Sequence, residues 1–353
     1  MRIHILYEFK DGPWGGGNQF LKALRTEFIA RNVYEEDIYE ADVVLFNSYP
    51  FGNLEYFNLI NKLKKIKGIL VFHRLDGPIS VVRGQNLEID HITFLFNNLY
   101  SDATIFQSVW VKKESEKLGL EINPNHTIII NAPDKNIFFK ENISYDPEEK
   151  LRIIATSWSG NMRKGFDVYE WLDKNLDFTK YKFTFIGNSP IRFQNILHLQ
   201  PLLSHELAIK LKENHVYITA SKHEPCSNAL LEAMHCGLPA IAYNNGGNAE
   251  IVGKGGELFT ENEEIIEKLE LIKNNYFEYV KRINLPDMTF VANEYLKFMK
   301  ELYEKDKSNL YKPKQIKSAQ IKEFNKILSN NNINYKIDDC NFISKIWNKI
   351  KIR

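Results

Sequence analysis

Short apolar runs alternate with amphipathic stretches along this chain of 353 residues, and the alternation starts again after about residue 150. Alternating strands and helices predict a parallel sheet covered by helices on both faces. In the first part of the chain, the predicted strands are Ile3–Tyr7, Val43–Asn47, Ile69–His73, Thr104–Gln107 and Thr127–Ile130. The predicted helices are Asn18–Arg31, Leu54–Ile66 and Val109–Leu118.

The second part repeats this pattern after the polar, turn-rich residues 140–150. Its predicted strands are Ile153–Ser157, Phe183–Ile186, Val216–Thr219 and Ala240–Tyr243, and its predicted helices are Phe166–Leu176 and Asn228–His235. We therefore predict an α/β protein of two Rossmann-like domains, over residues 1–145 and 146–288. In tandem sheets of this kind, ligands bind where the carboxyl ends of the strands face a shared crevice, so the loops after strands are the candidates for chemistry.

Composition excludes several classes of protein. The 46 basic and 45 acidic residues leave a net charge of +1, which argues against a dedicated nucleic-acid binder. Cys226, Cys236 and Cys340 cannot form a disulfide framework and lack zinc-site spacing, which indicates a reducing compartment. We read Cys226 and Cys236 as packing residues. The first residues do not resemble a signal peptide, and no run reaches the roughly 18 apolar residues of a membrane span. We expect a cytoplasmic protein.

Two loops of the first domain carry candidate residues. Gly15–Gly17 lie between a predicted strand and a helix, where the absence of Cβ atoms lets the backbone approach an anion; the alternative is a flexible turn. The segment HRLDGP places His73, Arg74 and Asp76 at the end of a strand. His73 there can position or polarise a hydroxyl group, or it can be a structural residue bonded to a neighbouring loop. Arg74, Asp76 and Arg83 can also simply pair with one another.

A basic loop follows the first strand of the second domain. Arg163 and Lys164 precede Gly165 and a predicted helix, so two cations meet a helix N-terminus, an arrangement suited to a diphosphate. A solvated basic loop is the alternative.

The segment EPCSNALLE contains two glutamates eight positions apart. Ser227 is a good N-cap for a helix starting at Asn228, and Gly237 with Pro239 predicts its end. Glu224 and Glu232 would be up to about 12 Å apart if all intervening residues were helical, whereas glycosidase pairs lie about 5–9.5 Å apart. This spacing fits better with two separate carboxylates that each accept hydrogen bonds from hydroxyl groups of one ligand. The helix N-terminus between them would then bind a negatively charged linker of that ligand. A nucleotide sugar has this layout.

These residues resemble a known family. Glu224 to Glu232 resembles the E-x7-E motif of retaining GT-B glycosyltransferases, particularly glycosyltransferase family 4, and AMHCGLPAIA and GGNAEIVG resemble its continuation. The glycine loop, Lys164–Gly165 and the segment from Asn131 to Phe138 agree with further family motifs. The resemblance covers residues 1 to about 304. It implies a GT-B fold whose two parallel sheets face a central cleft, with residues 289–304 as a closing helix that packs back towards the first domain.

The resemblance also implies a role for individual residues. Glu224 would hold hydroxyls of the donor sugar and Glu232 the ribose, while Lys164, with Arg163, would neutralise the diphosphate. The backbone amides of Gly16 and Gly17 would face the phosphates. The backbone amides of Cys226 and Ser227, next to Asn228, would face the sugar. His73 would act near the sugar and acceptor, with Arg74, Asp76 and Arg83 on the acceptor side. Main-chain groups near residues 186–190 and 199–203 would contact the base.

One departure from the family concerns the diphosphate clamp. Trp158 stands where the family commonly has an arginine, six residues before Lys164. The resemblance implies transfer with retention, in which the diphosphate leaves and the acceptor enters on one face, and Lys164 and the helix dipole stabilise the developing charge. The chain has no Asp-x-Asp, so we expect no metal and no cofactor besides the nucleotide-sugar substrate.

The end of the chain differs from the rest. Residues 305–353 contain 12 basic and 4 acidic residues, a net charge of +8. Phe342, Ile346, Trp347 and Ile350 share one helical face among lysines, which is typical of binding to an anionic membrane surface. The alternatives are packing on the protein's own body and a partner helix. We expect peripheral association with the inner membrane face.

Three functions compete at this point. The first is a hexosyltransferase acting on a glycan or lipid-linked acceptor in surface polysaccharide or glycoconjugate synthesis. The second is another GT-B enzyme, such as a nucleotide-sugar epimerase or a phosphorylase. The third is a nucleotide-sugar-binding or scaffold protein that has lost turnover, which the tryptophan at position 158 keeps open.

Overall fold

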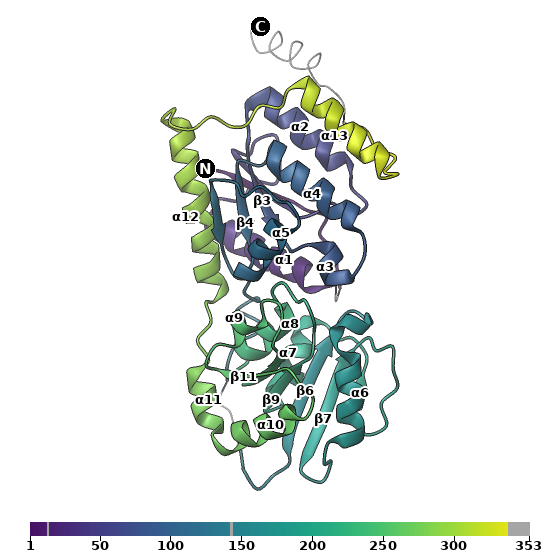
Figure 1. Cartoon of the computed structure of the whole chain (residues 1–353). Helices are drawn as coiled ribbons and strands as arrows, with labels where there is room; N and C mark the ends of the chain where they lie inside the picture. The colour runs from purple at the N-terminus through teal and green to yellow at the C-terminus, as the bar shows by residue number, and fades with distance from the viewer. Residues whose placement is uncertain (13, 142–143, 338–353) are drawn as a thin grey trace. The chain divides into compact units, whose positions relative to one another are not determined.

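A computed structural model describes residues 1–12, 14–141 and 144–337 (Figure 1). The chain divides into two compact units. Unit 1 comprises Met1–Glu8, Arg25–Ile129 and the chain from Ala292, and unit 2 comprises Phe9–Leu24 and Ile130–Val291. Both units are α/β with a parallel sheet, which confirms the predicted fold class.

Unit 1 contains a five-stranded parallel sheet whose strands follow the order of the sequence. Val43–Asn47 is buried at every position, because helices cover both faces of the sheet. The strands are β1 (Ile3–Leu6), β2 (Val43–Asn47), β3 (Leu70–Leu75), β4 (Ala103–Phe106) and β5 (His126–Ile128). The helices are α2 (Glu55–Lys67), α3 (Ile79–Arg83), α4 (Leu87–Tyr100), α5 (Val109–Lys117) and α13 (Ser318–Asn330).

Unit 2 contains a six-stranded parallel sheet in the order β11-β10-β9-β6-β7-β8. The order reverses at β6, which pairs with β7 on one side and β9 on the other. The strands are β6 (Leu151–Ser157), β7 (Tyr181–Gly187), β8 (Leu197–Leu199), β9 (Val216–Thr219), β10 (Ala240–Tyr243) and β11 (Gly256–Phe259). The helices are α6 (Phe166–Asn175), α7 (Ser204–Lys212), α8 (Asn228–His235), α9 (Asn248–Val252), α10 (Glu264–Asn274) and α11 (Tyr276–Arg282).

Two helices run from one unit into the other. The residues of α1 (Gly16–Ala30) belong to unit 2 up to Leu24, and those of α12 (Met288–Lys307) belong to unit 1 from Ala292. Within unit 1, Phe298 of α12 packs edge-on against Phe72, with the ring centroids 5.5 Å apart.

The boundary between the units lies at residue 129 instead of the expected 145. Residues after Ile129 pack into unit 2: Phe138 is part of its core, and Tyr145 stacks on Tyr276 with ring centroids 4.1 Å apart. The polar composition of residues 140–150 had indicated a linker, but these aromatic contacts attach the preceding segment to unit 2.

The C-terminal extension belongs to the core of unit 1. Ile321, Phe324 and Leu328 of α13 are buried, and Phe324 contacts Phe57 of α2 edge-on. Figure 1 shows α13 beside α2 and α4. Residues up to 337 therefore follow the alternative in which the tail packs on its own body. The amphipathic stretch that begins at Phe342 lies outside the described residues.

Candidate functional site

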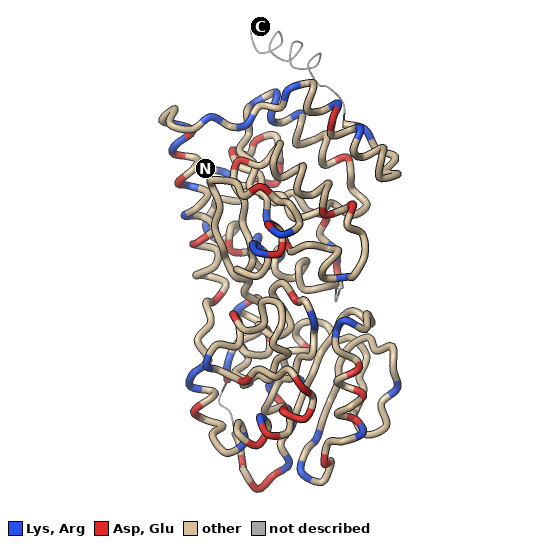
Figure 2. The backbone as a smooth tube through the Cα atoms, in the orientation of Figure 1, with Lys and Arg blue, Asp and Glu red and all other residues tan. Residues whose placement is uncertain are grey.

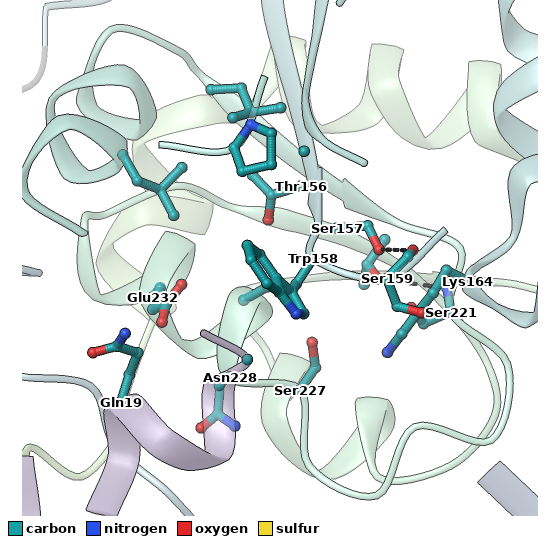
Figure 3. A pocket seen from close by; sticks show the side chains of 18 of the residues that line it. Gln19, Thr156, Ser157, Trp158, Ser159, Lys164, Ser221, Ser227, Asn228 and Glu232 are labelled. Carbon is teal, nitrogen blue, oxygen red and sulfur yellow. Dashed lines mark hydrogen bonds between the residues drawn. The ribbon is translucent and has the colours of Figure 1, made fainter. Parts of the chain in front are cut away.

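A pocket of unit 2 lies where the sheet order reverses, at the carboxyl ends of β6, β7 and β9 (Figure 3). This is the position at which open parallel sheets bind ligands. The residues lining the pocket are Trp14, Gly15, Gly16, Gln19, Thr156, Ser157, Trp158, Ser159, Lys164, Ile186, Gly187, Pro201, Leu202, Ser204, Leu207, Tyr217, Thr219, Ser221, Glu224, Ser227, Asn228, Ala229 and Glu232.

A glycine places Lys164 in this pocket. Gly165, which follows the 3₁₀ turn η1 (Met162–Lys164), has a φ of +83°. A Cβ atom at Gly165 would lie 2.3 Å from the carbonyl oxygen of Ala220, so the turn packs directly on the chain after β9. The amide of Lys222 donates to the carbonyl of Arg163 at 2.8 Å, which joins the same two loops.

Lys164 forms an ion pair with Glu224. The Nζ atom lies 2.5 Å from the Oε2 atom, and both side chains are largely shielded from water. The pair brings together two residues that the sequence had placed in separate roles. Their charges cancel, so the remaining lining groups determine the net charge of the pocket.

The backbone around Glu224 is held by the loop after β10. The carbonyl of Glu224 accepts a hydrogen bond from the amide of Gly247 at 2.7 Å. Gly246 has a φ of +67°, and a Cβ atom there would lie 2.3 Å from this carbonyl oxygen. The amide of His223 donates to Oδ1 of Asn245 at 2.7 Å. Gly246 and Gly247, which follow β10, therefore let the loop after β10 approach the loop that carries Glu224 and hold its backbone in place.

Helix α8 begins at the pocket as predicted. The hydroxyl of Ser227 accepts from the amide of Leu230 at 3.2 Å, which confirms the N-cap. Asn131 donates to Oδ1 of Asn228 at 3.1 Å. A Cβ atom at Gly16 would lie 2.5 Å from the Asn228 side chain, so the close approach requires glycine at this position.

Glu232 projects into the pocket from the second turn of α8 (Figure 3). In the described part of the chain no hydrogen bond to its carboxyl group is found, and the lining also contains the apolar side chains of Leu202 and Leu207. Burial raises the pKa of Glu232 to about 8. At pH 7 the protonated form of this carboxyl group is therefore favoured.

Two tryptophans form an aromatic wall that the sequence had not predicted. The indoles of Trp14 and Trp158 have centroids 6.2 Å apart and planes at 41°. The side of Trp158 faces Gly15, where a Cβ atom would lie 3.6 Å from the ring. In the view of Figure 3, Trp158 stands between Glu232 and Lys164. Trp158 places an apolar surface at the position where the sequence had already indicated the absence of a second cation.

Six of the predicted donor-site residues line the pocket, and three do not. Gly16, Lys164, Glu224, Ser227, Asn228 and Glu232 are in the lining, whereas Gly17, Arg163 and Cys226 are not. Cys226 and Cys236 are buried in the core of unit 2, which confirms that they are packing residues. Cys340 lies outside the described residues. Strand-end residues such as Thr156 and Ser221 were missed, although their place after strands was the available signal.

His73 is enclosed within unit 1. Its Nδ1 atom accepts from the Asn97 amide at 3.1 Å, so Nε2 carries the proton and donates to the carbonyl of Ser48 at 2.9 Å. The side chain is fully buried, and burial lowers the pKa of His73 to about 4. These contacts favour the structural alternative, because both ring nitrogens already have partners inside the unit.

Arg74 and Asp76 form an ion pair at the carboxyl edge of the unit 1 sheet. Arg74 is buried and also donates to Oδ1 of Asn47 at 2.6 Å and to Oε1 of Gln107 at 2.8 Å. The carboxylate of Asp76 is partly exposed, so Arg74 orients an accessible anion. Arg83 does not join this pair, and its guanidinium lies 5.1 Å from the centre of the Phe51 ring.

Neither a metal site nor a membrane-spanning helix is found in the described residues. Across residues 1–12, 14–141 and 144–337, no three His, Cys, Asp or Glu side chains are grouped so that they would hold a metal ion. Over the same ranges, no helix is long and apolar enough to cross a bilayer.

Comparison with known proteins identifies related sequences. Residues 194–284 match the family described as Glycosyl transferases group 1. A probable sucrose-phosphate synthase of Thermosipho melanesiensis is 30% identical over 136 residues, which are 37% of this chain and 32% of that protein. The match thus spans about a third of the length of that relative.

Solved structures share the fold over most of the chain. Sucrose-phosphate synthase from Thermosynechococcus elongatus superposes with a TM-score of 0.64 at 12% identity, covering 86% of this chain and 100% of that chain. Anabaena HepE in complex with UDP-glucose superposes with a TM-score of 0.63 at 11% identity, covering 85% of this chain and 99% of that chain.

Proposed function

We propose that this protein is a retaining glycosyltransferase of family 4 that moves a hexose from a nucleotide-diphosphate sugar to an acceptor hydroxyl group. The observation that carries the proposal is the presence of Lys164, Glu224, Glu232 and the start of α8 in one pocket of unit 2. The match of residues 194–284 to glycosyl transferases group 1 supports it, because this segment contains the last three of these features.

The pocket offers one partner for each part of such a donor. The carboxyl group of Glu232 has no hydrogen bond from the described residues, so it is available to the ribose hydroxyls. Lys164 and the amides at the start of α8 suit the diphosphate. Glu224, oriented by Lys164, would accept hydrogen bonds from the hexose. Gly16 completes this set within the lining, whereas roles for Gly17, Arg163 and the amide of Cys226 stay predictions, because these residues do not line the pocket.

The proposed reaction breaks the bond between C1 of the hexose and the diphosphate oxygen, which keeps the electron pair. The acceptor oxygen bonds to C1 on the same face, and its proton passes to the departing diphosphate. Lys164 stabilises the charge that develops on the phosphate, and this electrostatic effect is commonly the largest in such a step. We propose that the reaction needs no metal ion.

The acceptor is proposed to be a glycan or a lipid-linked saccharide, in surface polysaccharide or glycoconjugate synthesis on the cytoplasmic side of the membrane. The accessible carboxylate of Asp76, oriented by Arg74, is the best candidate in unit 1 for contact with the acceptor. Roles for Arg83 and His73 stay predictions. For His73, the role would require its two internal hydrogen bonds to open.

A nucleotide-sugar-binding protein without turnover is a second candidate. The observation in its favour is Trp158, which leaves Lys164 as the cation in the lining and pairs it with Glu224. Such a pocket can bind a donor yet give less stabilisation to a departing diphosphate.

The experiment measures binding and turnover separately. The purified chain is titrated with UDP-, GDP- and ADP-sugars, and release of nucleotide is followed with and without candidate acceptors. We expect one donor class to be bound and turned over, and Lys164→Ala and Glu224→Gln to abolish turnover while the fold persists. Matched controls are the exposed Lys182→Ala and Glu267→Gln.

The outcomes separate the two candidates. If the chain binds a donor but releases no nucleotide with any of the acceptors, the result supports a binding protein without turnover. Full turnover by Lys164→Ala or Glu224→Gln contradicts the roles assigned here. Absence of binding to every nucleotide sugar contradicts both candidates.

A further inference from the structure

A groove on unit 1, far in sequence from the donor pocket, lies between α13 and the chain that follows it. We name it the lysine groove. The residues lining it are Lys322, Asn325, Lys326, Ser329, Asn332, Ile333, Asn334, Tyr335 and Lys336. Three of these are lysines, and most of the others carry an amide or hydroxyl group.

The walls of the groove are held by specific contacts. Asn325 donates to the carbonyl of Ile337 at 2.7 Å and accepts from its amide at 2.5 Å. Ile337 is buried in the core of unit 1, so this double hydrogen bond fastens the returning chain beside the helix. Asn332 has a φ of +57°, which lets the chain reverse at the end of α13. The groove therefore has a defined shape before any ligand arrives.

The opposite face of α13 explains why the lysines point outwards. Phe324 and Leu328 pack into the core, whereas Lys322 and Lys326 are exposed one turn apart. Like charges at this spacing repel each other, and Glu323, which is exposed on the same helix, offsets only part of the three lysine charges of the groove. No ion pair or hydrogen bond to the ammonium groups of Lys322, Lys326 or Lys336 is found within the described residues.

The surrounding segment adds to the positive field. Residues 305–337 contain eight lysines and two acidic residues. Figure 2 shows the lysines spread along the chain between α12 and α13 and on α13 itself. Within the groove, the side-chain amides of Asn332 and Asn334 supply further hydrogen-bond donors. Clustered lysines attract multiply charged anions, and neighbouring amide and hydroxyl donors suit phosphate oxygens.

We infer that the lysine groove binds phosphate groups of an anionic ligand, as a site separate from the donor pocket. The phosphates belong either to the headgroups of an anionic lipid or to a free, soluble phosphate compound. The inference does not depend on the proposed transferase activity, because every residue of the groove belongs to the C-terminal extension on unit 1.

The test uses the full chain and two probes. Vesicles of phosphatidylglycerol and phosphatidylcholine, compared with pure phosphatidylcholine vesicles, report on lipid phosphate. Sodium tripolyphosphate, titrated by calorimetry, reports on free phosphate. In the variant Lys322→Gln/Lys326→Gln/Lys336→Gln, we expect affinity for the bound probe to fall on the order of 100-fold, from roughly fivefold for each of the three lysines. Binding by the unmodified chain should weaken with added salt.

A matched control separates this site from general charge. Lys182→Gln/Lys254→Gln/Lys281→Gln removes the same charge from exposed lysines of unit 2 and should leave binding unchanged. Loss of vesicle binding alone assigns the site to lipid headgroups, and loss of tripolyphosphate binding alone assigns it to soluble phosphates. If neither probe binds, or if both triple variants bind as the unmodified chain does, the inference is wrong. Thermal unfolding of the variants checks that each is folded.

Discussion

Lys64 and Asp102 form an ion pair in unit 1 in which neither side chain is exposed to solvent. The carboxylate of Asp102 also accepts from the amide of Val71 at 2.7 Å, the hydroxyl of Tyr311 at 3.0 Å and the amide of Lys314 at 2.7 Å. One buried carboxylate thus joins α2, the start of β3 and the C-terminal extension. Burial lowers the pKa of Lys64, so the ammonium group depends on this carboxylate for its charge.

Replacing Asp102 with alanine should lower the free energy of unfolding by about 3–5 kcal/mol, because it leaves a buried ammonium group and several donors without a partner. Urea denaturation measures the effect. The double variant Lys64→Met/Asp102→Asn should recover part of the loss, because it removes the uncompensated charge and keeps an acceptor. A loss below about 1 kcal/mol in Asp102→Ala would contradict the structural role given to this contact.

Gly165→Ala should weaken both stability and binding of a nucleotide sugar. Alanine at a φ of +83° costs roughly 1–2 kcal/mol, and its Cβ would collide with Ala220, displacing Lys164 from the pocket. Gly119→Ala is the matched control, since Gly119 has a φ of +97° and nothing within 4 Å of the added atom. Both variants should lose stability, but Gly165→Ala should lose more and should alone lose nucleotide binding. Equal effects would argue against the packing explanation.

Glu232 should make the protein less stable as the pH rises. The pKa of Glu232 is about 8 in the folded protein and 4.5 as its ordinary value, so between these values the folded state holds a proton that the unfolded state has released. The free energy of unfolding therefore falls from about pH 4.5 to about pH 8 and then levels. Urea titrations at several pH values should show a flatter profile for Glu232→Gln. Parallel profiles for the two proteins would mean that Glu232 is ionised in the pocket.

Trp158→Arg should strengthen binding of nucleoside diphosphates. The lining contains Lys164 and two glutamates, so an added cation beside the proposed diphosphate position is expected to raise affinity roughly tenfold, in line with hydrogen bonds to charged groups. Trp158→Gln separates this gain from loss of the indole. Calorimetric titration with UDP compares the three proteins. The explanation fails if the arginine and glutamine variants bind UDP equally.

Helices and strands were predicted correctly from the sequence where neighbouring residues alone determine the pattern of apolar and polar side chains. The strand Val216–Thr219 and the helix Asn228–His235 were predicted with their observed bounds, because a buried strand and a capped amphipathic helix each leave a distinct signal. Helix α4 was missed. Its buried residues include Asp90, Thr93 and Asn97, which share one face of the helix at i, i+3 and i+7, so polar side chains interrupt the apolar stripe on which the periodicity depends.

The parts of the site that were predicted are those whose residues lie close together in the sequence. Glu224 and Glu232 belong to one short segment and were found together. The pairing of Glu224 with Lys164 was not, since it depends on Gly165 packing against Ala220, a contact between distant parts of the chain. The aromatic partner of Trp158 was missed for the same reason, because Trp14 is separated from it by a whole domain of sequence.

Unit 1 is built from the first eight residues, residues 25–129 and the chain from Ala292, whereas unit 2 is complete once Val291 has been made. All segments of unit 2 are therefore translated before the last segment of unit 1. Until the segment with Tyr311 and Lys314 emerges, Asp102 lacks two of its donors and the surface that α13 covers is open to water. Since domains generally fold as units during synthesis, unit 2 should mature first and the N-terminal sheet last, the reverse of the order in which their first strands are translated.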